Sequence, residues 1–257
     1  MAANVSIVIP VWDSHTQLLP RCLQAIRNEP VAVELIVVDN ASTVPLAGLP
    51  PNARCVRLSE RQSIGAARNA ALAVVNTPFI VFADADDEVA PGSLAHSLTL
   101  LQHDPHAAGV LGRSLVEEHG HYRRGLRPTT AFRLACTYTP ALAPLFWLAG
   151  YQCSITSTLL HTATVHDAGG FADADIGEDW HLAARMARRQ RFICLDQPVR
   201  IYHRHPDAAR ETRPVPPTRA LRQNIYADCI ADRSSSPTQR LAASALRRLP
   251  PRRPATA

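Results

Sequence analysis

Hydrophobic residues in the first part of the chain gather in short runs, and each run ends in a group of small polar residues. Residues 5–11 (VSIVIPV) and 33–38 (VELIVV) are rich in β-branched side chains, which is typical of strands buried on both faces. Between them, residues 15–28 carry leucine, cysteine and isoleucine at helical spacing. The order strand, helix, strand predicts a βαβ unit with parallel strands.

The same alternation continues toward the middle of the chain. It predicts strands over residues 54–58, 79–83 and 109–115, and helices over residues 64–75 and 91–102. We therefore predict an α/β fold in which a mostly parallel sheet is flanked by helices. Ligands of such sheets bind outside the carboxyl ends of the strands, and Asp13, Asp39, Asp84 and Asp86 all fall at such ends.

The second half of the chain has a less regular pattern. Residues 116–168 contain an apolar segment interrupted by prolines, and the pattern does not define their structure. Further along, it predicts a helix over residues 180–189, strands over 192–195 and 199–202, and helices over 220–231 and 239–249.

Positive charge is concentrated at the C-terminal end. The 257 residues carry a net charge of +5, and all 27 basic residues are arginine. Ten arginines and three acidic residues lie beyond residue 209, so this segment carries +7 and the rest of the chain −2. The basic character belongs to the C-terminal segment, and a nucleic-acid-binding body is not implied.

This basic segment admits two interpretations. A chain end rich in proline and serine is favoured as disordered. Alternatively, it is an amphipathic element at an anionic membrane surface, where arginines face the headgroups and leucines insert. The residues concerned are Arg240, Leu241, Leu246, Arg247, Arg248 and Leu249.

The six cysteines are widely spaced and form no CxxC pair, which is typical of buried thiols in a reducing compartment. The N-terminus has no basic region before its first apolar run, so a signal peptide is not expected. The longest apolar stretch, residues 141–151, is about half of the roughly 20 residues that a membrane span needs. We expect a cytoplasmic protein, with at most peripheral contact at the inner face of the membrane.

Residues Asp84, Ala85, Asp86 and Asp87 place three carboxylates on one turn. Their mutual repulsion is costly unless a cation or hydrogen-bond donors neutralise it. Carboxylate oxygens suit Mg²⁺ or Mn²⁺, and such an ion commonly also holds substrate phosphates. The alternative is a solvated acidic turn that caps the following helix.

Four further features carry candidate chemistry, each with a structural alternative. Asp39 can accept from a nucleobase or ribose, or can stabilise its own turn. Arg68, early on a helix, can face an anion or solvent. Glu178 and Asp179 precede a helix and can supply a general base or a cap. His203 and His205 can supply a ligand, or are polar surface residues.

The order of these features resembles that of the inverting, nucleotide-sugar-dependent glycosyltransferases of the GT-A fold, family 2. The resemblance runs from residue 5 to about residue 206. It rests on the segments SIVIPVWD, LIVVDNAS, GAARNAAL, FADADD, and GGF followed by GEDWHLAARM.

The resemblance implies a role for each matching residue. The nucleotide sugar would contact Pro10, Val11, Asp13, Asp39, Arg68, Asp84, Ala85 and Asp86. A divalent metal, Mn²⁺ or Mg²⁺, would be held by Asp86 and His205. Asp179 would be the catalytic base, with Glu178 beside it, and acceptor-side contacts would come from Trp147, Tyr151, Gln152 and Trp180. Packing accounts for Trp147 and Tyr151 equally well.

The implied reaction moves one sugar, with inversion, from a UDP-, GDP- or dTDP-sugar to a hydroxyl of a small-molecule, glycan or lipid-linked acceptor. Residues 1–115 would form the donor half of the domain, residues 116–209 the acceptor-binding and catalytic half, and residues 210–257 a basic helix and tail.

The chain departs from the family pattern at two places beside the expected nucleobase pocket. Trp12 and Asp13 follow the first strand where Tyr-Asn is common, and Asn40 replaces a second Asp. A dinucleotide-binding dehydrogenase would need a GxGxxG sequence after the first strand, and a nucleotidyltransferase would need a glycine-rich loop there; the chain has neither. A relative that binds a nucleotide or a protein partner without catalysis is the alternative function.

Overall fold

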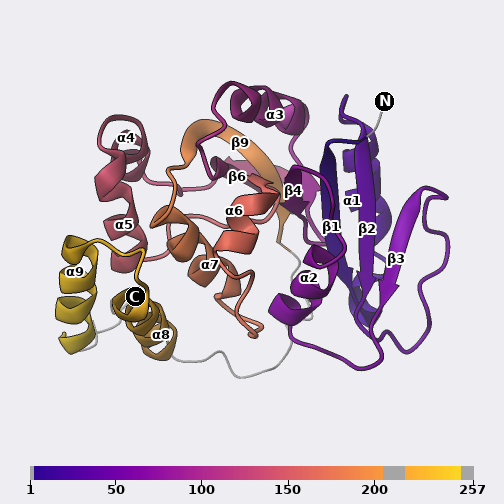
Figure 1. The fold of residues 1–257 in the computed structure, drawn as a ribbon. Helices are drawn as coiled ribbons and strands as arrows, with labels where there is room; N and C mark the ends of the chain where they lie inside the picture. The colour runs from indigo at the N-terminus through magenta and orange to yellow at the C-terminus, as the bar shows by residue number, and fades with distance from the viewer. Residues whose placement is uncertain (1–2, 205–217, 250–257) are drawn as a thin grey trace.

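The computed structural model describes residues 3–204 and 218–249, and its strands form one sheet that helices flank (Figure 1). The first four long strands are parallel and lie in the order β3-β2-β1-β4. They are β1 (Val5–Val11), β2 (Val33–Asp39), β3 (Ala53–Arg57) and β4 (Phe79–Phe82). The α/β prediction and these four strands are confirmed. The apolar runs of β1, β2 and β4 are buried on both faces of the sheet, whereas β3 lies at its edge and is largely exposed.

The second half of the sheet mixes strand directions. Strand β8 (Leu159–His161) joins it antiparallel to β4, and β6 (Gly109–Glu118) pairs antiparallel to β8. The two strands predicted at 192–195 and 199–202 are one continuous strand, β9 (Ile193–His203), which lies parallel to β6. A register shift between Leu111 and Arg113 interrupts this pairing, so the apolar pattern in the sequence is also interrupted.

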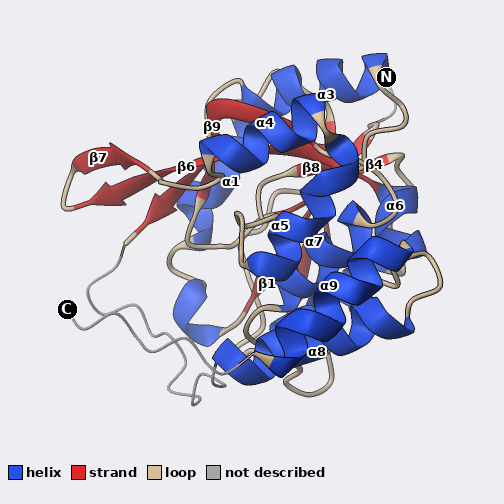
Figure 2. Cartoon of the chain, turned by 90° about the vertical axis from the view of Figure 1, so that its left-hand side faces the viewer, coloured by secondary structure: helices blue, strands red, loops and turns tan. Residues whose placement is uncertain are grey.

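Besides β8, two further short strands were not predicted. Strand β5 (Glu88–Val89) follows the acidic turn and pairs with β9, and β7 (His121–Arg124) forms a hairpin with β6. Figure 2 shows this hairpin projecting from the body of the molecule. All four residues of β7 are exposed, so the hairpin leaves no buried apolar pattern in the sequence.

The helices begin and end within a few residues of the predicted bounds. They are α1 (Leu19–Arg27), α2 (Ile64–Leu72), α3 (Ser93–His103) and α7 (Glu178–Ala187). The helix predicted from residue 15 begins at Leu19, because a short 3₁₀ turn (Asp13–His15) precedes it. Helix α1 packs on one face of the sheet with Leu19, Cys22 and Ile26, whereas α2 and α7 contribute to the core of the opposite face.

The segment that the sequence left undefined is mostly helical, apart from β7, β8 and the end of β6. It contains α4 (Thr130–Tyr138), a 3₁₀ turn (Pro140–Leu142), α5 (Ala143–Ala149) and α6 (Thr162–Asp167). Each helix is short, and prolines stand at the first turns of the 3₁₀ turn and of α5. No single helical period therefore extends through this segment.

The described part of the C-terminal segment is folded onto the domain. Helices α8 (Thr218–Ala231) and α9 (Pro237–Arg248) pack against each other, and Ile225, Cys229 and Ala243 join the main core. Arg188, directly after α7, is almost fully buried and pairs with Asp228 at 2.8 Å and Asp232 at 2.9 Å. Disorder, the favoured interpretation of the segment, is wrong for residues 218–249; residues 210–217 and 250–257 lie outside the described part.

The interpretation of α9 as a membrane-lying helix is only partly compatible with its packing. Leu241 and Leu249 are exposed, but Leu246 packs against the core and cannot insert into lipid. In the described residues, no helix is long and apolar enough to cross a bilayer.

Two glycines set how closely the site-forming segments approach. A side chain at Gly65 would place its Cβ 1.9 Å from the carbonyl oxygen of Ala172, so only glycine lets the start of α2 contact this loop. Gly177, directly before α7, has a φ of +77°, and its Cβ would meet Leu221 of α8 at 2.4 Å. These contacts fix the N-terminal ends of α2 and α7.

Candidate functional site

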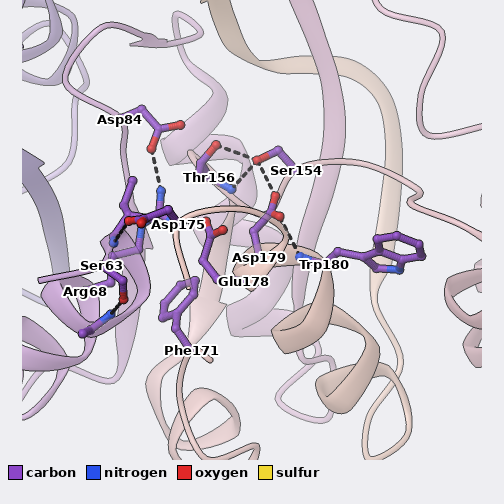
Figure 3. Close-up of polar contacts among 12 residues, drawn as sticks. Ser63, Arg68, Asp84, Ser154, Thr156, Phe171, Asp175, Glu178, Asp179 and Trp180 are labelled. Atoms are coloured by element: carbon purple, nitrogen blue, oxygen red, sulfur yellow. Dashed lines mark hydrogen bonds and ion pairs between the residues drawn. The ribbon is translucent and has the colours of Figure 1, made fainter. Parts of the chain in front are cut away.

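A buried arginine joins the acidic turn to the start of α7. Arg68 on α2 is 1% exposed and donates to Asp84 at 2.6 Å and to Glu178 at 2.5 Å (Figure 3). Burial alone would lower the pKa of Arg68, but the charges of Asp84 and Glu178 raise it. Arg68 therefore holds two carboxylates from distant parts of the chain at one place, and its expected contact with the nucleotide stays a prediction.

Asp179 lies at the start of α7 within a shell of hydrogen-bond donors. Its Oδ2 accepts from the Tyr151 hydroxyl at 3.0 Å and from the Ser154 hydroxyl at 3.1 Å. Its Oδ1 accepts from the Trp180 backbone N–H at 2.7 Å (Figure 3). Burial and the charge of Asp179 raise the pKa of Tyr151, so its phenol stays protonated as a donor. The carboxylate is thus fixed in orientation.

A second buried arginine completes the connection between Asp179 and the acidic turn. Arg200 on β9 bonds to the hydroxyl of Thr156 and lies 3.5 Å from Asp84 and 3.3 Å from Asp87. The Thr156 hydroxyl lies 2.7 Å from that of Ser154, which donates to Asp179. A continuous chain of polar contacts therefore leads from Asp179 through Ser154, Thr156 and Arg200 to Asp84.

The three carboxylates of the acidic turn have different surroundings. Asp84 is paired with both arginines, and Asp87 is buried, where it accepts from the His203 backbone N–H at 3.2 Å. Asp86 forms no ion pair within the described residues, and burial together with the charge of Asp84 raises its pKa. Asp86 is therefore the carboxylate of the turn that is available for a cation.

The charge balance of the site also favours a cation. Two buried guanidinium groups, those of Arg68 and Arg200, face five carboxylates: Asp84, Asp86, Asp87, Glu178 and Asp179. An excess of hard oxygen donors fits Mg²⁺ or Mn²⁺. No cluster of three or more metal-ligating side chains is preformed among the described residues. A metal held at Asp86 would need further oxygen ligands from substrate or water.

Residues 6–160 match the sequence model described as "Glycosyl transferase family 2". This match covers more than half of the chain. The chain belongs to glycosyl transferase family 2. By class, this glycosyltransferase is a transferase, and its α/β sheet with the acidic turn after β4 agrees with that membership.

Two curated relatives of this glycosyltransferase come from Rhizobium meliloti. The succinoglycan biosynthesis protein ExoO is 30% identical over 96 residues, which are 35% of this chain and 28% of ExoO. The succinoglycan biosynthesis protein ExoU is 34% identical over 103 residues, which are 37% of this chain and 30% of ExoU. The matches thus span less than a third of each relative.

Solved structures share the fold over nearly the whole chain. The S. aureus TarS 1–349 complex with UDP-GlcNAc has a TM-score of 0.73 at 16% identity, covering 95% of this chain and 71% of TarS. The mannosyltransferase PcManGT from Pyrobaculum calidifontis, in complex with GDP-Man and Mn²⁺, has a TM-score of 0.63 at 21% identity, with coverages of 96% and 70%. At these identities the likeness shows a common GT-A fold.

In this glycosyltransferase the residues expected at the nucleobase lie at the ends of β1 and β2. Val11 is the register partner of Asp39, and Pro10 precedes it in β1. Asp39 is buried and accepts from the Ser42 N–H at 2.9 Å and from Arg57; burial opposes ionisation, but these hydrogen bonds lower its pKa.

Asp13 has a structural partner in this glycosyltransferase. Its carboxylate accepts from the Thr43 backbone N–H at 2.7 Å and from the Thr43 hydroxyl at 3.0 Å. Asp13 thereby connects the start of the first loop to the loop after β2. Beside it, the Arg61 guanidinium stacks on the Trp12 ring at 3.3 Å. The Trp-Asp departure from the family pattern thus has a local structural role.

The acceptor-side residues separate into core residues and one site residue. Trp147 is fully buried against Phe132, and Gln152 is 5% exposed and donates to the carbonyl of Phe146 at 2.7 Å. The Trp180 indole is buried as well and donates to the Trp147 carbonyl at 2.9 Å. Packing accounts for these three, whereas Tyr151 contacts Asp179.

The two histidines that were expected to supply a ligand, His203 and His205, have different outcomes. His205 lies outside the described residues. His203 is buried, with Nδ1 2.9 Å from Glu117 and Nε2 2.6 Å from Glu88, so it links β5, β6 and β9. Ala85 is 4% exposed and packs into the core below the acidic turn.

Sequence reasoning missed Ser154, Thr156 and Arg200. An arginine inside the apolar strand VRIY was a usable signal, because a buried guanidinium requires carboxylate partners. Ser154 and Thr156 lie in an irregular Ser- and Thr-rich segment, where the sequence gives no sign of which hydroxyl faces the site.

Proposed function

We propose that this protein transfers one glycosyl group from a nucleoside-diphosphate sugar to an acceptor hydroxyl with inversion, assisted by a divalent metal. The observation that supports this most is the orientation of Asp179 by Tyr151, Ser154 and the Trp180 N–H, beside but separate from the acidic turn. The reaction needs one carboxylate as a general base and another to hold the metal that stabilises the leaving diphosphate. In this proposal Asp179 is the first and Asp86 is the second.

In the proposed reaction, Asp179 accepts the proton of the acceptor hydroxyl while its oxygen attacks the anomeric carbon of the donor. The bond between this carbon and the diphosphate oxygen breaks at the same time, and the diphosphate leaves with the bonding electron pair. Attack opposite the leaving group inverts the anomeric centre. Tyr151 and Ser154 keep the carboxylate directed during the transfer.

Asp86 is the residue that would hold the metal, because its carboxylate has no ion pair within the described residues. A bound divalent ion supplies charge stabilisation for a diphosphate. Arg200 and Arg68 pair with Asp84 beside Asp86. The proposed contact of Asp84 with the ribose side of the donor rests on the family resemblance. His205 stays a predicted further ligand.

The donor class follows from the family and the fold. TarS was solved with UDP-GlcNAc and PcManGT with GDP-Man, so UDP- and GDP-sugars are the first candidates, and dTDP-sugars follow. Asp39 is proposed to accept an N–H of the base, which requires its pair with Arg57 to open or to tilt. The acceptor is proposed to be a hydroxyl of a small molecule, a glycan or a lipid-linked sugar.

The test combines donor binding with turnover. Calorimetry with UDP and GDP, with and without Mn²⁺, should give metal-dependent binding that Asp86→Ala weakens at least tenfold. Asp179→Asn should bind the nucleotide as the unchanged protein does, but it should release nucleoside diphosphate from the matching nucleotide sugar at least a hundredfold more slowly. Asp167→Asn, an exposed change on α6, is the control.

The same assay tests the non-catalytic alternative. Metal-dependent nucleotide binding without release of nucleoside diphosphate from any donor and acceptor pair would favour a binding protein of this fold. Full turnover by Asp179→Asn would refute the assignment of the base.

A further inference from the structure

Large exposed apolar side chains concentrate in one short part of the chain. Among the described residues eight such side chains are exposed, and five of them lie between residues 122 and 142. They are Tyr122 at 59%, Leu126 at 85%, Leu134 at 51%, Tyr138 at 76% and Leu142 at 48%. Single exposed apolar residues are ordinary, but a cluster of them marks an interaction surface.

Helical spacing aligns two of these side chains. Leu134 and Tyr138 are four residues apart on α4, so they share one face of this helix. Leu142 follows in the 3₁₀ turn after Thr139, where the helical backbone is interrupted, and it is exposed as well. The opposite side of α4 is already buried through Phe132 and Cys136. Every residue from 137 to 142 is exposed. The fold therefore has no need of these apolar groups for its core.

The charge around these side chains is positive on balance, although Glu117, the register partner of Tyr122, and Glu118 lie on the neighbouring strand β6. Residues 119–166 contain no aspartate or glutamate but four arginines. Arg124 of β7 and Arg133 of α4 both reach Asp196, at 3.1 Å and 2.9 Å, which places the base of the hairpin beside α4. Arg113 joins them at 2.8 Å, so three guanidinium groups share one carboxylate. The local charge is positive.

Helix α9 extends this character on the same side of the molecule. It packs against α5, and Figure 1 shows α4, α5 and α9 along one side, which faces the viewer in Figure 2. Residues 237–248 contain three arginines and no acidic residue. Leu241 is 72% exposed.

We propose that the α4 surface, made of Leu126, Leu134, Tyr138 and Leu142 with Arg124 and Arg127, docks on an anionic lipid bilayer. Leucine and tyrosine side chains insert at the level of the headgroups, while the arginines contact lipid phosphates. Each arginine near such a surface contributes about 1 kcal/mol, or roughly fivefold in binding. A nucleic acid would use the positive charge but leave the leucines without a partner.

The α4 surface is connected to the site by the chain itself. The 3₁₀ turn that carries Leu142 continues directly into α5, which ends at Ala149, and Tyr151 contacts Asp179. Arg127 of the surface bonds to the Tyr151 carbonyl. Docking would hold this acceptor-side segment at the lipid headgroups, which suits an acceptor hydroxyl on a lipid-linked sugar. The acceptor preference rests on the proposed function, whereas the docking itself does not.

Vesicle sedimentation of the full chain tests the docking. We expect at least tenfold tighter binding to vesicles of phosphatidylcholine with about 30% phosphatidylglycerol than to phosphatidylcholine alone, and a marked loss at high salt. The double change Leu134→Asp with Tyr138→Asp should weaken binding at least tenfold. Val44→Asp removes an equally exposed apolar side chain, at 74%, from the loop after β2 and should have no effect.

Other outcomes would overturn the proposal. If the double variant bound vesicles as before, but a variant with Arg252→Gln and Arg253→Gln lost vesicle binding, the contact would belong to the basic chain end. Absence of vesicle binding, or self-association that the double variant abolishes, would assign the surface to a protein partner. Nucleotide calorimetry on the same samples separates the two proposals, because lost vesicle binding with intact metal-dependent nucleotide binding refutes only the docking.

Discussion

Replacing Arg68 by methionine tests the central electrostatic feature of the site. The guanidinium is 1% exposed and is held between Asp84 at 2.6 Å and Glu178 at 2.5 Å. Methionine keeps most of the side-chain volume but removes the charge. Two carboxylates then remain close together without this counter-ion, and Glu178 is buried.

The expected loss is large because an unpaired buried charge is costly. Removing one partner of a buried ion pair destabilises a protein by about 3–5 kcal/mol. For a domain of this size, this corresponds to a fall of roughly 6–20 °C in Tm. Exposed ion pairs contribute only about 0–1 kcal/mol, so Arg27→Met on the exposed end of α1 is a matched control and should change little.

The pH dependence of the loss identifies its cause. Burial and the charge of Asp179 already raise the pKa of Glu178 above its ordinary 4.5, and loss of Arg68 raises it further. A carboxyl with a raised folded-state pKa contributes less stability as pH rises through the interval between the unfolded and folded values. Arg68→Met should therefore lose more stability at pH 8 than at pH 5.

Urea unfolding at both pH values measures these free energies, and Arg68→Met combined with Glu178→Gln completes the test. Removing the second charge should recover part of the loss, because one unpaired carboxylate is gone. A loss below about 1 kcal/mol for Arg68→Met, equal losses at the two pH values, or a double variant that is weaker than the single one would refute the reasoning.

Three other changes probe separate parts of the molecule. Tyr151→Phe removes one hydrogen bond to Asp179, so sugar transfer should slow by about 10–100-fold with unchanged nucleotide binding, a split that steady-state kinetics resolves. A second change concerns Asp228. Burial raises the pKa of its carboxyl, but hydrogen bonds from His181 and Arg188 outweigh burial and lower this pKa from 3.8 to about 2. Roughly 1–2 kcal/mol of stability should therefore be lost as pH falls from about 4 to 2, measurable by acid unfolding of the protein against Asp228→Asn. Gly65→Ala would put its Cβ 1.9 Å from a backbone carbonyl oxygen and should lower Tm by at least several degrees in a thermal scan.

The first half of the fold could be predicted because each of its strands and helices has a clear pattern of apolar residues. The runs at 5–11 and 33–38 are buried on both faces, which leaves continuous β-branched residues in the sequence. The acidic turn after β4 was predictable for the same reason, since polar residues at the end of a buried strand mark the ligand edge of an α/β sheet.

Contacts between distant segments lay beyond the sequence. The segment from α4 to α6 consists of short helices that are fixed by packing on the sheet and on α7, so its local pattern has no clear period. Helices α8 and α9 were predicted from their own pattern, but their packing on the domain was not, because the composition suggested disorder. That packing includes Arg188, which directly follows α7 and pairs with two aspartates of the C-terminal segment.

For the proposed site, the sequence determined which residues are candidates for the chemistry, and the tertiary structure decided what each one touches. Asp86 and Asp179 were predictable from their motifs, because carboxylates at a strand end and before a helix are local features. That Arg68 bridges Asp84 and Glu178, and that Arg200 connects Thr156 to the acidic turn, depends on side chains up to 116 residues apart in the chain. Such partners are set by the crossing of strands and helices, and no local spacing encodes them.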